Sequence, residues 1–185
     1  MGVIMSVVHL PNPNLGVEQA LLCDDEEFAS FLSEQIPILM KRQLQGKVLD
    51  FCLADTAAWN PDTDIVAEFG VFKGAGVSKI AAAAPHMTVH GFDSFEGFDV
   101  EWKDPLTGEV FAAAGTFDQA GRMPDVPENV ELVKGFFKAS LPPFLERHGA
   151  DRKIAFMHLD ADTYEATRDV FEAVAARIRP GGVVV

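Results

Sequence analysis

Cysteine, basic residues and long apolar runs are all scarce in this chain of 185 residues. Its two cysteines, Cys23 and Cys52, are far apart and form no C-x-x-C pair, so the sequence predicts neither a disulfide framework nor a zinc site. Lys and Arg number 15 against 28 Asp and Glu, which gives a formal net charge of −13. Because nucleic acids and anionic membranes bind basic surfaces, this charge argues against both as partners.

No apolar run approaches the ~20 residues of a membrane-spanning helix, and the N-terminus lacks the basic start of a signal peptide. Residues 1–6 match only the loose myristoylation pattern, which occurs often by chance. These features and the cysteine usage favour a cytoplasmic protein. The length and the 48% hydrophobic content are typical of one globular domain. Whether the chain forms a homo-oligomer is left open.

A strand–turn–helix unit lies in the middle of the chain, over residues 64–80. The apolar run 65–67 predicts a buried strand, and Glu68 follows at its end. A turn with three glycines comes next, and a helix over 77–84 ends at Pro85. This arrangement lets backbone approach a nucleotide-like ligand at a helix N-terminus. The glycine order, G-x-x-x-G-x-G, differs from the dinucleotide fingerprint, so a purely structural turn stays an alternative.

Strands and helices alternate from there to the end of the chain. Further strands are predicted over 88–93, 130–133 and 153–159 and from 183 onward, with helices over 141–148 and 165–178. The alternation predicts an α/β fold of the Rossmann-like, doubly wound type with a parallel sheet. Because the chain stops inside an apolar strand, the sequence also predicts that it is a fragment.

Two other regions surround this core. Residues 1–16 are expected to be irregular, and residues 17–53 have a helical apolar rhythm. We assign 1–60 to an N-terminal helical cap and 61–185 to the core of a single domain; whether the cap covers a ligand or only packs on the sheet stays open. Residues 94–128 are rich in glycine, proline, aromatic and acidic residues, which predicts a functional loop that orders on ligand binding.

Carboxylates follow three of the predicted strands, at Glu68, Asp93 and Asp160. The carboxyl ends of parallel strands share one edge of the sheet, where such folds bind ligands, so we expect these side chains to meet there. Asp162, two residues after Asp160, is expected to face the same way if the strand persists. Scattered turn residues are the alternative. We interpret His158, which has apolar neighbours, as a core histidine.

Four motifs resemble class I S-adenosylmethionine (SAM)-dependent methyltransferases, and most closely the macrocin O-methyltransferase type. The resemblance covers residues 64–185 and depends on E-x-G-x-x-x-G-x-G from Glu68, GFDSFEG from Gly91, KGFF from Lys134 and HLDADTY from His158. It implies a sheet with strand order 3-2-1-4-5, from which C-terminal antiparallel strands are missing in this chain.

The resemblance also implies a role for each motif. Glu68 and the backbone of Gly70 would hold the methionine end of SAM, and Asp93 would bind the ribose hydroxyls. Asp160 would be the catalytic residue, acting as a base or as a magnesium ligand beside Asp162. The complete cofactor-binding set is Glu68, Gly70, Gly74, Asp93, Ser94, Gly135 and Phe136, of which the last two would lie near the adenine.

The sequence therefore predicts a SAM-dependent methyltransferase that transfers a methyl group to a hydroxyl of a small molecule, such as a sugar or a natural product. Carboxylates suit a cationic donor, and an alcohol needs a base or a metal such as Mg²⁺ before it attacks. Two alternatives remain at this stage. One is an NAD-dependent oxidoreductase with a divergent fingerprint, and the other is a cofactor-binding fragment without turnover.

Overall fold

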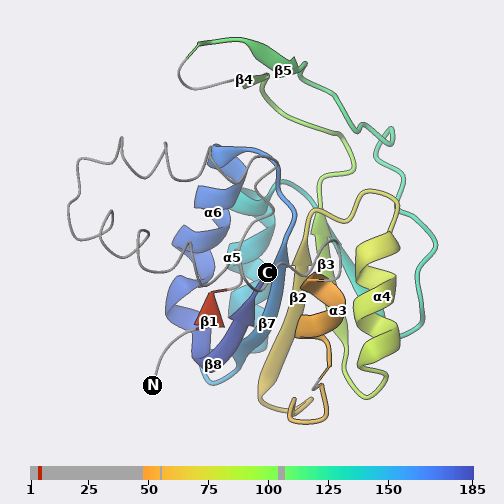
Figure 1. Ribbon diagram of the computed structural model, residues 1–185, viewed down its shortest axis with the longest axis vertical. Helices are drawn as coiled ribbons and strands as arrows, with labels where there is room; N and C mark the ends of the chain where they lie inside the picture. The colour runs from red at the N-terminus through yellow and green to blue at the C-terminus, as the bar shows by residue number, and fades with distance from the viewer. Residues whose placement is uncertain (1–3, 6–47, 55, 104–106) are drawn as a thin grey trace.

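A parallel sheet of six strands forms the centre of the protein (Figure 1). The structure, a computed structural model, describes residues 4–5, 48–54, 56–103 and 107–185. The strands of the sheet are β1 (Ile4–Met5), β2 (Asp64–Phe69), β3 (Val89–Asp93), β6 (Val130–Lys134), β7 (Lys153–Leu159) and β8 (Ile178–Val184). The helices are α3 (Val48–Cys52), α4 (Ala75–Ala83), α5 (Phe137–His148) and α6 (Tyr164–Val174), and a 3₁₀ turn, Ala175–Arg177, follows α6.

The sheet order is β1-β8-β7-β2-β3-β6. The five predicted strands neighbour one another as expected, but β1 pairs with β8 and adds a sixth strand, so the predicted order 3-2-1-4-5 does not match the complete sheet. Our expectation that residues 1–16 are irregular is therefore wrong at Ile4–Met5, since a pair of residues is too short to show a strand pattern. Most of the predicted helical cap, residues 6–47, lies outside the described residues.

Helices cover both faces of the sheet, as the doubly wound prediction requires. Side chains of β2 alternate between two apolar clusters because successive residues of a strand point to opposite faces. Val66 packs with Val77 and Ile80 of α4, and Leu49 and Leu53 of the α3 region lie in the same cluster. On the other face, residues of β2 pack with α5 and α6 through a second cluster that includes Ile65, Phe69, Leu141, Phe144 and Val170.

Two further predictions need correction. We expected residues 179–182 to form a turn before the last strand, but β8 already begins at Ile178, and those four residues make an irregularity between its pairings with β7. Within the predicted loop 94–128, the structure places an antiparallel hairpin, β4 (Trp102–Lys103) with β5 (Val110–Ala112). Both strands are too short for their sequence pattern to reveal them. Among the helices that the structure describes, none has the length and hydrophobicity needed to cross a bilayer.

Candidate functional site

A cavity of about 390 Å³ lies at the carboxyl ends of β2, β3 and β7. The residues that follow these strands line it, together with the first turns of α4 and α6. Because β2 pairs with β3 on one side and with β7 on the other, the three chain segments leave the sheet next to one another. The cavity therefore occupies the position at which open α/β sheets bind ligands.

The glycine turn after β2 lies directly against the backbone that follows β7. Gly70 has φ of 92°, and a Cβ at this position would collide with the carbonyl oxygen of Asp160. The backbone N–H of Asp160 donates to the carbonyl of Phe69 at 2.8 Å, which joins the two segments. Only glycine permits this approach, since other residues would meet both strain and a clash. The turn thus brings Asp160 to the cavity.

Glu68 is buried beneath the turn. Its side chain lies against Gly76 in the first turn of α4, where a Cβ would collide with the Oε1 atom of Glu68. Oε1 accepts a hydrogen bond from Nδ1 of His158 at 2.8 Å, whereas Oε2 is buried without a partner among the described residues. Burial raises the pKa of this carboxyl group, and the hydrogen bond from His158 opposes that shift. A buried, unpaired carboxylate oxygen at a cavity wall can accept a hydrogen bond from a ligand.

Asp93 uses both carboxylate oxygens to hold the surrounding loops. Oδ2 accepts hydrogen bonds from the backbone N–H groups of Val71 (2.8 Å) and Phe72 (2.7 Å), and Oδ1 accepts one from Phe95 (2.7 Å). Neighbouring Ser94 acts similarly, because its Oγ accepts from the N–H of Glu96 at 3.1 Å. In this structure, therefore, Asp93 shapes the cavity wall through the backbone on both sides of it.

Asp160 and Asp162 both line the cavity, but not for the reason that the sequence suggested. The strand ends at Leu159, and Asp162 has φ of 52°, so the two side chains are not related by the alternation of a strand. Burial and the nearby charge of Asp160 raise the pKa of the Asp162 carboxyl group. The carboxylate groups of Asp160 and Asp162, which line the same cavity, provide oxygen ligands of the kind that Mg²⁺ prefers.

Most of the predicted site residues lie in the wall of this one cavity: Glu68, Gly70, Asp93, Ser94, Phe136, Asp160 and Asp162. Gly74 and Gly135 do not line it; Gly74 precedes α4 with φ of 84°. Sequence reasoning missed another group of wall residues, which are Phe72, Lys73, Phe98, Asp99, Phe117, Glu165 and Asp169. The unusual aromatic and acidic content of the loop 94–128 was a signal for the wall residues within it. The sequence held no such signal for Phe72, Lys73, Glu165 and Asp169.

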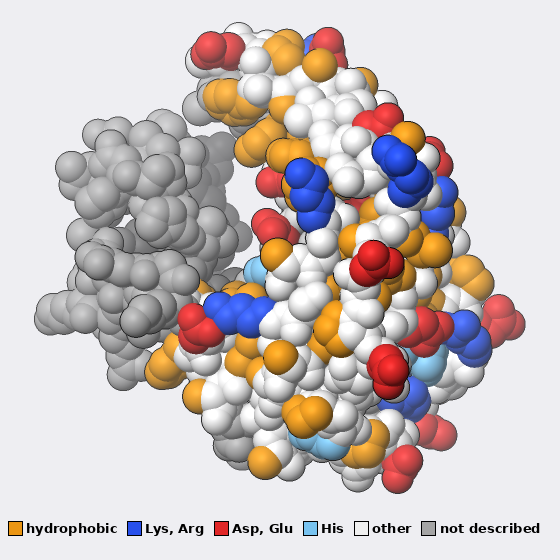
Figure 2. All heavy atoms as spheres, turned by 90° about the vertical axis from the view of Figure 1, so that its right-hand side faces the viewer, with side chains coloured by type: hydrophobic (Ala, Val, Ile, Leu, Met, Phe, Trp, Pro, Cys, Tyr) orange, Lys and Arg blue, Asp and Glu red, His pale blue; other side chains and the backbone are white. Residues whose placement is uncertain are grey.

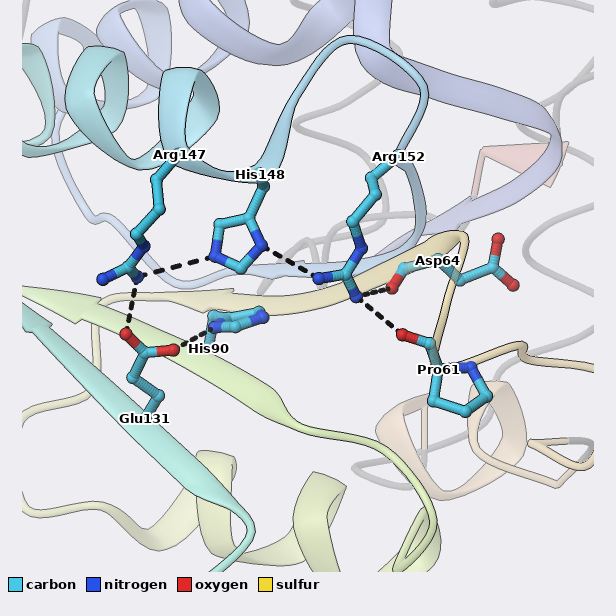
Figure 3. Close-up of polar contacts among 7 residues, drawn as sticks. All are labelled: Pro61, Asp64, His90, Glu131, Arg147, His148 and Arg152. Atoms are coloured by element: carbon cyan, nitrogen blue, oxygen red, sulfur yellow. Dashed lines mark hydrogen bonds and ion pairs between the residues drawn. The ribbon is translucent and has the colours of Figure 1, made fainter.

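A second polar cluster lies between β3, β6 and the end of α5 (Figure 3). His90, Glu131 and His148 form a group of three side chains whose ligand atoms lie within 4.8 Å of one another. Arg147 donates to Glu131 at 2.6 Å, and Arg152 donates to Nδ1 of His148 at 2.9 Å. The guanidinium groups of Arg147 and Arg152 bring positive charge to the cluster, which disfavours a metal cation. The hydrogen bond from Arg152 also occupies the lone pair of His148 Nδ1. We therefore interpret this cluster as a structural network rather than a metal centre.

Within the network, the imidazole of His90 is almost completely buried. Glu131 Oε2 lies 3.2 Å from its Nδ1, but neither ring nitrogen completes a hydrogen bond with the described residues. Burial lowers the pKa of His90 to about 4, and the positive charges of Arg147 and Arg152 act in the same direction. His90 is therefore neutral at physiological pH.

Comparison with known proteins identifies the family. Residues 67–185 match the family model described as a methyltransferase domain. The chain belongs to this methyltransferase family. The match confirms the recognition of a methyltransferase from the four motifs, and it includes Gly70, Asp93 and Asp160 of the cavity wall. It also decides against the NAD-dependent oxidoreductase.

One curated relative agrees with this assignment. The methyltransferase is 27% identical over 161 residues to 8-demethyl-8-(2,3-dimethoxy-alpha-L-rhamnosyl)-tetracenomycin-C 4'-O-methyltransferase of Streptomyces olivaceus. That alignment covers 74% of this chain but 57% of the relative, so the chain spans little more than half the length of this relative.

Two solved structures are similar to this chain. The crystal structure of CalS11, a calicheamicin methyltransferase, is similar with a TM-score of 0.56 and 23% identity, over 96% of this chain and 78% of that one. An apo structure of CalS11, titled a TDP-rhamnose 3'-O-methyltransferase, has a TM-score of 0.49 and 21% identity, over 96% of this chain and 79% of that one. The first likeness supports the Rossmann-like methyltransferase fold of the chain.

Proposed function

We propose that this chain is a SAM-dependent O-methyltransferase that acts on a hydroxyl group of a small molecule, such as a sugar or a natural product. The observation that carries the proposal is the cavity at the strand ends, where Glu68, Asp93 and Asp160 come together in a chain of the methyltransferase family. The curated relative, named as an O-methyltransferase of a rhamnosyl tetracenomycin, supports a hydroxylated acceptor. A cytoplasmic location is part of the same proposal.

The residues of the cavity fit the cofactor. The unpaired Oε2 of Glu68 is an acceptor for an ammonium group such as that of the methionine end of SAM. The exposed ring of Phe136 in the cavity wall supplies a flat apolar surface for the adenine. We infer that Asp93 contributes indirectly to binding of the ribose of SAM, because it holds the glycine turn in place. These carboxylates also complement the positive charge of a sulfonium.

Bound SAM supplies a methyl group on a sulfonium, so that an O–CH₃ bond forms as the S–CH₃ bond breaks and the hydroxyl proton is released. Asp160, at the end of β7, is the residue that we assign to this proton. Its carboxylate would accept a hydrogen bond from the acceptor hydroxyl and orient the oxygen, and positioning contributes strongly in such a displacement. Asp160 and Asp162 would also hold Mg²⁺ if the reaction uses it, because Mg²⁺ commonly binds through one or two carboxylates plus water.

A paired experiment tests this assignment. Asp160→Asn keeps the shape of the side chain but removes the charge, so methyl transfer should fall by roughly 10²–10⁴-fold, the usual contribution of a general base. The dissociation constant of S-adenosylhomocysteine should change little, because Glu68 and the glycine turn remain. Rates with and without added Mg²⁺, and with the variant Asp162→Asn, separate a metal role from a base role. An unchanged rate in Asp160→Asn, or a collapse of cofactor binding, would refute the role given to Asp160.

A cofactor-binding chain without turnover is the second candidate. It is favoured by one observation: the chain spans 57% of the length of the curated relative, so the match leaves out a large part of that enzyme. S-adenosylhomocysteine binding with no methyl transfer to any of a panel of hydroxylated acceptors would support it. Methylated product, detected by mass spectrometry, would exclude it.

A further inference from the structure

A hydrogen-bonded pair of side chains joins two adjacent strands at the cavity. His158 of β7 is the register partner of Glu68 of β2, and its Nδ1 donates to Oε1 of Glu68 at 2.8 Å. The side chain of Glu68 is 2% exposed, and that of His158 is 19% exposed. Glu68 lines the cavity, whereas His158 lies outside its wall. The imidazole that we interpreted as a core histidine therefore has a polar partner in the cavity wall.

The carboxyl group of Glu68 is also held by α4. It accepts a hydrogen bond from the backbone N–H of Val77, in the first turn of this helix. The N-cap residue of α4 is Gly74, which has no side chain that could accept this bond. A Cβ at Gly76 would lie 2.0 Å from Oε1 of Glu68, so the helix backbone packs directly on this oxygen. Contacts with β7 and with α4 thus limit the rotation of the carboxyl group.

The other oxygen of this group, Oε2, remains for a ligand. It is buried and has no hydrogen-bond partner among the described residues. A carboxylate oxygen that is removed from water is unfavourable unless a donor reaches it, and a ligand in the cavity can supply that donor. Rotation about the Cγ–Cδ bond of Glu68 would exchange the two oxygens. The hydrogen bond from His158 opposes this rotation because it fixes Oε1.

Negative charge alone does not orient a cationic group in this protein. The formal net charge is −13, and acidic side chains are spread over the face of the molecule that Figure 2 shows. Such a charge distribution attracts cations to many parts of the surface. Binding of an ammonium group in one orientation therefore depends on a carboxylate whose direction is fixed by its neighbours, and Glu68 has this property.

We propose that His158 is a positioning residue for the methionine end of SAM. It holds Oε1 of Glu68, so that Oε2 is presented to the α-ammonium group of the cofactor. This inference rests on the proposed function. It also gives separate tasks to two residues of one segment: His158, near the end of β7, acts on cofactor affinity, and Asp160, which follows the strand, acts on methyl transfer.

Two probes test the proposal by calorimetry: S-adenosylhomocysteine and 5'-methylthioadenosine, which has the adenosine and the sulfur but lacks the amino acid end. His158→Leu should lower the ratio of the two affinities by roughly 10- to 100-fold, the factor expected for a weakened hydrogen bond with a charged group. His158→Asn should restore most of the ratio, because its amide N–H takes the place of Nδ1. His158→Phe, which keeps a ring without a donor, replaces the leucine variant if that one does not fold.

The matched control is His90→Leu. His90 and Glu131 are also register partners on adjacent strands, β3 and β6, and neither lines the cavity (Figure 3). This variant should leave the affinity ratio at the wild-type value even if it lowers the melting temperature. In a Glu68→Ala background, His158→Leu should cause no further fall in the ratio, because the acceptor of its hydrogen bond is absent.

Each outcome has a defined meaning. A lower ratio in His158→Leu that recovers in His158→Asn supports the proposal. Equal losses of affinity for both probes would show that His158 only stabilises the fold, and would overturn it. A ratio that stays low in His158→Asn, or falls further in the Glu68→Ala background, overturns it as well. A lower ratio in His158→Leu, in a protein that transfers no methyl group, would refute the proposed function but leave this inference standing.

Discussion

Asp93 holds the glycine turn through both of its carboxylate oxygens, and this geometry makes a prediction at the scale of one residue. Asp93→Asn leaves one acceptor oxygen and turns an NH₂ group toward backbone donors. We expect the free energy of unfolding, measured with urea, to fall by roughly 1–3 kcal/mol, the cost of an unsatisfied buried group. Cofactor affinity should fall with it, since the cavity wall depends on the turn.

The control for Asp93 is Glu96→Gln, an exposed residue of the same loop. This variant should leave both the free energy of unfolding and the affinity for S-adenosylhomocysteine unchanged. If Asp93→Asn weakens S-adenosylhomocysteine binding while stability stays at the wild-type value, Asp93 acts on the ligand directly and not through the turn.

Gly76 and Glu68 should be coupled, because a Cβ at residue 76 would collide with the buried carboxylate. Gly76→Ala alone should destabilise the protein by about 1–3 kcal/mol, as overpacking usually does. In a Glu68→Ala background the clash is gone, and the same change should stabilise the helix by about 0.5–1 kcal/mol. A double-mutant cycle in urea measures the difference. Additive effects would show that the two residues do not touch.

At the scale of elements, the packing of α5 against β3 and β6 should be sensitive to acid. His90 is buried among Glu131, His148, Arg147 and Arg152, and its pKa is lowered from 6.5 to about 4. Between these two pH values the unfolded chain binds a proton that the folded chain excludes, so the free energy of unfolding falls as the pH decreases. The loss should reach roughly 2–3 kcal/mol near pH 4.

Replacing His90 tests this origin of acid sensitivity. His90→Leu should flatten the pH profile of unfolding between pH 6.5 and 4, whatever its effect at pH 7. His86→Leu, which removes an exposed histidine outside the network, is the control for the loss of one imidazole. An equal slope in wild type and His90→Leu would mean that other groups cause the acid sensitivity.

At the scale of the whole molecule, the sequence predicted the parts of the fold that follow from continuous apolar patterns. The run 65–67, which a carboxylate and a glycine turn follow, and the longer run 153–159 indicate buried strands, and their alternation with helices determines a parallel sheet. Once the sheet is parallel, Glu68, Asp93 and Asp160 must share one edge, which is why most of the predicted site residues line one cavity.

Other features depend on contacts between distant segments, which periodicity does not reveal. β1 has two residues and is recognised only by its pairing with β8. The hydrogen bonds that the carboxylate of Asp93 accepts from the N–H groups of Val71 and Phe72 depend on the register of β2 with β3. The rings of Phe72 and Phe117, with centroids 5.2 Å apart, join the glycine turn to the loop 94–128, and neither segment alone suggests this contact.

The proposal that the cavity binds SAM is tested most directly by a crystal structure of the protein with S-adenosylhomocysteine. We expect ligand density in the cavity at the ends of β2, β3 and β7, with the amino group near Glu68 and the sulfur on the side of Asp160. Density at another site, or an empty cavity at saturating ligand, would contradict it.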